Sequence, residues 1–62
     1  MPIITLEGPK LTKEQKAELI AEFTKKASEI TNIPENAFSI LIKENLADNV
    51  GVGGKQLSEM KE

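Results

Sequence analysis

The chain has 62 residues, with 8 Lys+Arg against 10 Asp+Glu, so its formal net charge is −2. It contains no His and no Cys, which excludes zinc fingers, disulfide frameworks and nucleophiles activated by histidine. A mildly acidic chain without a basic stripe is a poor nucleic-acid binder, and neither a membrane-spanning run nor a signal peptide is visible, so we expect a cytoplasmic protein.

The length predicts one domain over residues 1–62. A domain of this size buries only about 60% of its unfolded surface and is marginally stable alone. Small scaffolds are usually reinforced by disulfides, a metal or oligomerisation. Because the chain lacks the Cys and His ligands for the first two, the sequence predicts an oligomer.

The first predicted element is a strand over residues 3–6, a β-branched run followed by a turn over residues 8–11. A helix then runs from the N-cap Thr12 to about Thr31, since Thr12 and Gln15 fit a capping box. Asn32 is the expected C-cap, because the proline at position 34 ends the helix.

Apolar residues recur along one face of this helix, and three of them are predicted to lie in the core: Ile20, Phe23 and Ile30. A second strand is predicted over residues 37–43, where apolar and polar residues alternate. The glycines that follow Val50 predict a tight hairpin. Residues 56–62 are expected to form a short helical turn or to fray.

The order strand, helix, strand predicts an α+β fold of β-α-β type, with two parallel strands joined by a right-handed crossover and followed by the hairpin. One helix covers only one face of such a sheet. The other face, which carries Leu41, is left bare, and two strands alone are not stable in water. We therefore expect another subunit to cover or extend the sheet.

Pro2 is the most informative residue for chemistry. Met1 is normally removed before a small second residue, which would leave Pro2 with a secondary amine at the N-terminus. An α-amine titrates at about 7.7–8.0 when unperturbed, and burial or nearby cations lower that value. In a chain without histidine, this amine is the best candidate for a base that works near neutral pH.

Several short motifs in this order resemble the 4-oxalocrotonate tautomerase family, and the similarity covers nearly the whole chain. The motifs are Pro2-Ile3-Ile4, Leu6-Glu7-Gly8, Glu14-Gln15-Lys16 and Gly51-Val52-Gly53-Gly54. The resemblance implies a β-α-β subunit assembled as dimers into a homohexamer. It also implies an isomerase that uses no cofactor or metal, in which Pro2 is general base and acid in the keto–enol tautomerisation of a 2-hydroxydienoate or a related 2-oxo acid.

Three positions depart from the family pattern. Lys10 is the nearest cation to the place of one family arginine, Ser39 stands where a second arginine begins the second strand, and Val50 replaces an aromatic residue. The resemblance makes all three candidate substrate-binding residues. Since lysine lacks the bidentate fork of arginine and serine supplies no positive charge, we expect low activity on dicarboxylates or a preference for a smaller or less charged substrate.

Two other functions also fit the sequence. The missing arginines and aromatic residue also fit an oligomeric interaction module without catalysis. A different reaction that depends on Pro2, such as hydration or decarboxylation of an unsaturated acid, is a third possibility. Glu7 and Glu44 end the two strands and are conceivable as an acid/base pair, although exposed strand-end glutamates are the simpler interpretation.

Overall fold

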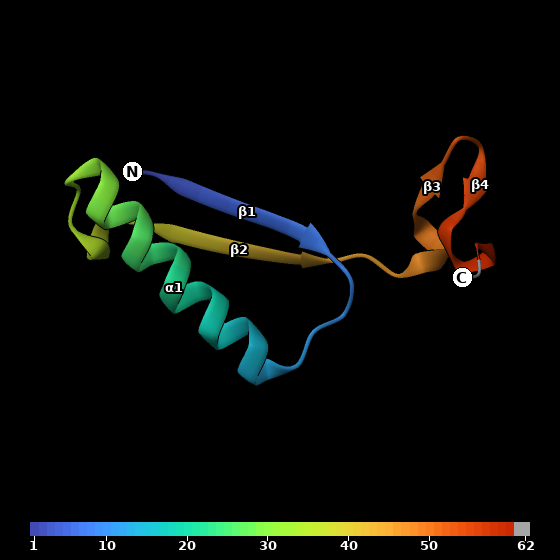
Figure 1. Ribbon diagram of the computed structural model, residues 1–62, viewed down its shortest axis with the longest axis horizontal. Helices are drawn as coiled ribbons and strands as arrows, with labels where there is room; N and C mark the ends of the chain where they lie inside the picture. The colour runs from blue at the N-terminus through green and yellow to red at the C-terminus, as the bar shows by residue number, and fades with distance from the viewer. Residues whose placement is uncertain (61–62) are drawn as a thin grey trace.

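The computed structural model describes residues 1–60, and the last two residues of the predicted domain, 61 and 62, lie outside the described residues (Figure 1). Its elements are β1 (Ile3–Gly8), α1 (Lys13–Thr31), β2 (Ser39–Glu44), β3 (Gly51–Val52) and β4 (Lys55–Gln56), with 3-10 turns at Glu35–Ala37, Ala47–Asn49 and Leu57–Glu59. β1 and β2 pair in parallel, and β3 and β4 pair antiparallel. The predicted β-α-β fold with a C-terminal hairpin is confirmed.

Both ends of α1 are capped as the sequence predicts. The Gln15 backbone N–H donates to Thr12 Oγ1 over 3.0 Å, and the Thr12 N–H donates to Gln15 Oε1, also over 3.0 Å. At the other end, Asn32 has a φ of 62°, a left-handed conformation that asparagine tolerates better than most residues. Its N–H donates to the Ser28 carbonyl over 2.9 Å, which ends the helix.

The strand boundaries differ from the predicted ones. β1 continues two residues beyond the predicted end, because Glu7 and Gly8 find partners in Lys43 and Glu44 of β2. The predicted start of the second strand at Ala37 is wrong. Ala37 belongs to a 3-10 turn, where its N–H donates to the Pro34 carbonyl over 3.0 Å.

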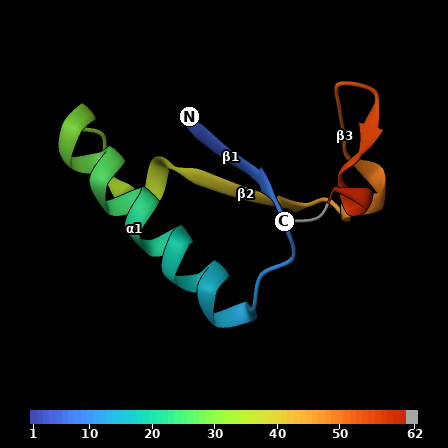
Figure 2. The same ribbon diagram turned by 45° about the vertical axis from the view of Figure 1, so that its right-hand side comes forward.

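One face of the sheet is covered and the other is not. Figures 1 and 2 show α1 on a single side of β1 and β2. On the covered side, the half-buried Ile4 and Leu6 stand beside their half-buried β2 partners. On the other side, Ile3 is 57% exposed and Leu41 is 49% exposed. The sequence predicts that the face carrying Leu41 is left bare, and the structure confirms this prediction.

The subunit has no closed core within residues 1–60, since none of these residues is buried. Ile20 and Ile30 are predicted core residues but are 42% and 74% exposed, so for these two the prediction is wrong in the single subunit. Phe23, the third predicted core residue, is half-buried. The radius of gyration is 15.0 Å, whereas a compact chain of this length has about 11 Å. The accessible surface is 5117 Å², against about 4,000 Å² for a compact monomer of this mass.

The C-terminal hairpin stands beyond the ends of β1 and β2 (Figure 1). Its two-residue loop is Gly53-Gly54, with φ values of 61° and 86°, which is the backbone of a type I′ turn and confirms the predicted hairpin. The Leu57 N–H closes its base by donating to the Val50 carbonyl over 2.7 Å. Of the predicted turn over residues 56–62, Leu57–Glu59 forms a 3-10 turn. No helix within residues 1–60 is long and apolar enough to cross a membrane.

Candidate functional site

Pro2 and Ser39 lie side by side where β1 and β2 begin. The Ser39 N–H donates to the Pro2 carbonyl over 3.0 Å, and Ser39 is the register partner of Ile3. The Ser39 hydroxyl lies 3.7 Å from the Met1 sulfur. Pro2 and Ser39 are both half-buried, whereas Met1 is 87% exposed. Parallel pairing therefore brings one predicted base and one predicted hydrogen-bond donor to the same end of the sheet.

Lys10 and Val50 lie at the opposite end of the strands. Both line an open hollow of about 530 Å³ between the ends of the strands and the hairpin, a volume in the range of small-molecule sites. Most of its wall is apolar. The full lining is Glu7, Gly8, Pro9, Lys10, Asn45, Leu46, Ala47, Val50 and Leu57.

The structure thus brings the four predicted site residues together in two pairs. β1 lies between the two pairs and is about 17 Å long at about 3.3 Å per residue, and Figure 1 shows the N-terminus and the hairpin at opposite ends of the sheet. One chain alone does not place Pro2 next to Lys10. A site that uses both pairs needs a second copy of the chain.

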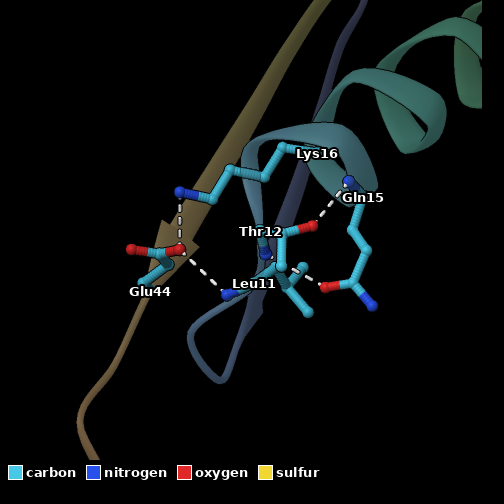
Figure 3. A network of polar contacts seen from close by, with 5 residues as sticks. All are labelled: Leu11, Thr12, Gln15, Lys16 and Glu44. Atoms are coloured by element: carbon cyan, nitrogen blue, oxygen red, sulfur yellow. Dashed lines mark hydrogen bonds and ion pairs between the residues drawn. The ribbon is translucent and has the colours of Figure 1, made fainter.

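The loop that carries Lys10 is fastened to the end of β2 by Glu44 (Figure 3). Glu44 Oε2 accepts a hydrogen bond from the Leu11 N–H over 3.0 Å and an ion-paired hydrogen bond from Lys16 Nζ over 2.6 Å. The hydrogen bond from Lys16, followed by that from the Leu11 N–H, holds the pKa of Glu44 below its ordinary value. The sequence marks Glu44 only as a strand-end glutamate and does not predict this contact, which joins positions 33 residues apart.

We expect Glu44→Gln to remove part of the acid sensitivity of folding. Because the pKa of Glu44 is lowered in the folded state, its charge stabilises the fold above the ordinary glutamate pKa, and this contribution is lost as the pH falls through the lowered value. Urea unfolding between pH 7 and pH 3 should give a flatter stability profile for Glu44→Gln than for the natural chain.

Glu29→Gln is the matched control. Lys26 Nζ lies 3.2 Å from Glu29 Oε1 in an exposed pair within the helix, and such pairs contribute little to stability. The dependence of the stability of Glu29→Gln on pH should therefore follow that of the natural chain. Equal profiles for both variants would show that Glu44 does not fasten the loop.

Glu7 is held beside the hollow by a different partner. Asn45 Nδ2 donates to Glu7 Oε1 over 3.2 Å, and the Asn45 backbone N–H donates to the Gly8 carbonyl over 2.8 Å. Since Glu7 and Glu44 each bind another group, the geometry favours structural roles over an acid/base pair. Within residues 1–60, no group of three or more acidic, His or Cys residues is placed to hold a metal.

Comparison with known proteins supports this description of the fold. A sequence model of the Tautomerase family, described as tautomerase enzyme, matches residues 2–60. The structure is similar to that of YwhB, a homologue of 4-oxalocrotonate tautomerase, with a TM-score of 0.90 and 33% identity over 97% of this chain and 100% of that one. It is also similar to DmpI from Archaeoglobus fulgidus, with a TM-score of 0.85 and 41% identity over 94% and 100% of the two chains.

A heterohexameric 4-oxalocrotonate tautomerase from Chloroflexus aurantiacus J-10-fl shares the fold, with a TM-score of 0.83 and 23% identity over 98% of each chain. A search of curated proteins finds no match to this chain.

Proposed function

The chain belongs to the tautomerase family, and on that premise we propose that it is a cofactor-independent keto–enol tautomerase with Pro2 as its general base and acid. The observation that carries the proposal is the family match, which begins at Pro2 and runs to residue 60. The substrate is a 2-hydroxydienoate or a related 2-oxo acid in its enol form. Removal of Met1 converts the Pro2 nitrogen from an amide into a secondary amine that can take a proton.

The reaction moves one proton within the substrate. The neutral Pro2 amine removes the proton from the enol hydroxyl, which leaves a dienolate, and the resulting ammonium returns the proton to a carbon of the same molecule. Atoms and charge balance without any other reactant. Ser39, which lies next to Pro2, donates a hydrogen bond to the substrate in this proposal.

The second pair of residues binds the rest of the substrate. Lys10 attracts the substrate carboxylate, and Val50 contributes to the apolar wall of the hollow that both residues line. A lysine gives a point charge instead of a bidentate fork. Since the loss of one stabilising donor costs about 10²–10³ in rate, we expect low turnover of dicarboxylates.

Catalysis by both pairs requires a homo-oligomer, and we propose a hexamer built from dimers. Two observations support an assembly: the exposed apolar face that carries Ile3 and Leu41, and an accessible surface of 5117 Å² that exceeds the value of about 4,000 Å² for a compact monomer. A second copy supplies Lys10 and Val50 to the Pro2 of the first.

The test combines intact mass with turnover of phenylenolpyruvate by the natural chain. We expect a mass that lacks Met1. We also expect measurable ketonisation, which is monitored as the loss of enol absorbance. A retained Met1 would leave Pro2 blocked. A free Pro2 without turnover of this enol or of a 2-hydroxydienoate would favour the non-catalytic module.

A further inference from the structure

We propose that the hollow that Lys10 and Val50 line selects a monoanionic enol acid with an uncharged apolar tail, and that Glu7 rejects a second carboxylate. The inference deepens the proposed function and rests on it for the chemistry of the reaction. It makes a separate claim about binding, because charge selection by the hollow does not require any proton transfer.

The hollow carries one charged side chain of each sign. Its lining contains one cation, Lys10, and one anion, Glu7. Lys16 and Lys26 are occupied by their acidic partners at 2.6 Å and 3.2 Å. Within residues 1–60, no ion pair shorter than 4.0 Å involves Lys10. Lys10 is therefore available to one carboxylate, and among residues 1–60 of the single chain no second cation lines the hollow.

Glu7 is hydrogen-bonded beside the hollow. Its carboxylate is held by Asn45 Nδ2 at 3.2 Å, and Asn45 is itself tied to the Gly8 carbonyl by its backbone N–H at 2.8 Å. In this geometry the negative charge of Glu7 lies beside the hollow. A substrate whose first carboxylate is bound by Lys10 would bring any second carboxylate into the field of Glu7, where like charges repel.

The wall of the hollow is mostly apolar and partly exposed to water. Leu46 is 66% exposed and Leu57 is 41% exposed, and both line the hollow together with Val50. An uncharged tail that covers these side chains removes apolar surface from water, which favours binding. A carboxylate in the same place would lose water without gaining a partner, which opposes binding.

The test measures binding of two unreactive acids by calorimetry at low ionic strength, where charge effects are least screened. The probes are trans-cinnamate, a monoanion with a phenyl tail, and trans,trans-muconate, a dianion. We expect the natural assembled protein to bind cinnamate at least about tenfold more tightly, the size of effect that one nearby like charge produces. Lys10→Gln should weaken the binding of cinnamate.

Glu7→Gln separates charge selection from shape. It should tighten muconate binding by about tenfold and leave cinnamate binding almost unchanged, because it removes the like charge and keeps the side chain's size. Glu22→Gln is the matched control: it makes the same charge change at an exposed position of α1 and should leave both affinities unchanged.

Two results would overturn the inference: muconate bound as tightly as cinnamate by the natural protein, or identical effects of Glu7→Gln and Glu22→Gln. The first would mean that the assembled site supplies a second cation. Selective cinnamate binding without turnover of phenylenolpyruvate would refute the tautomerase function and leave the charge selection standing. Turnover of phenylenolpyruvate with no preference between the two acids would refute the charge selection alone.

Discussion

Extending the chain by one residue ahead of Pro2, so that its nitrogen becomes an amide, is expected to lower kcat/KM for phenylenolpyruvate by about 10²–10⁴-fold, the usual contribution of a positioned general base. The amide has no basic lone pair, so the enol proton has no acceptor at this position. Steady-state kinetics on the extended and natural proteins, both checked by intact mass, would measure the effect.

Pro2→Ala is the companion variant for the same prediction. It keeps a free α-amine but makes it primary and changes its position, so we expect a smaller loss than in the extended chain. The pH profile of kcat/KM should fall below the pKa of the amine, since only the unprotonated form accepts a proton. Equal turnover by the natural and extended proteins, with the same assembly size, would rule out Pro2 as the base.

The second large effect is expected from Leu41→Glu, on the uncovered face of the sheet. Leu41 is 49% exposed in the single subunit, and Ile3 on the same face is 57% exposed. If a second subunit covers this face, the new carboxylate is buried without a partner, which costs about 3–5 kcal/mol. Light scattering should show a smaller particle, and circular dichroism should show loss of folded structure.

Ala21→Glu is the matched control, because it adds the same charge at an exposed position of α1, four residues before Lys25 in a spacing that favours an ion pair. This variant should keep both the particle size and the melting temperature of the natural protein. A Leu41→Glu protein that behaves in the same way would show that the face stays open to water.

The sequence predicts the helix ends well because they depend on local contacts. Thr12 and Gln15 are three residues apart and satisfy each other directly, and Asn32 caps the helix through Ser28. The strand ends are set by pairing between segments far apart in the chain, and the alternation of residues does not reveal where that pairing stops. The alternation therefore extends the predicted strand to Ala37, which lies in a turn.

In the candidate site, too, the sequence predicts local features better than contacts between distant residues. Pro2 stands out because the chain has no histidine to compete with it, whereas the contact between Glu44 and Leu11 leaves no mark in the spacing of the sequence. Helical periodicity identified Ile20 and Ile30 as residues that avoid water. It does not say which surface covers them, and both are exposed in the single subunit.

The distance between the two ends of β1 has a consequence for how duplicated genes of this protein can evolve. Because β1, about 17 Å long, lies between the pair Pro2 and Ser39 and the pair Lys10 and Val50, a site that spans two chains draws each pair from a different copy of the chain. After a gene duplication, one copy can lose the base and the other can lose the lysine, and a mixed assembly still contains complete sites. Selection would then preserve both copies, each unable to act without the other.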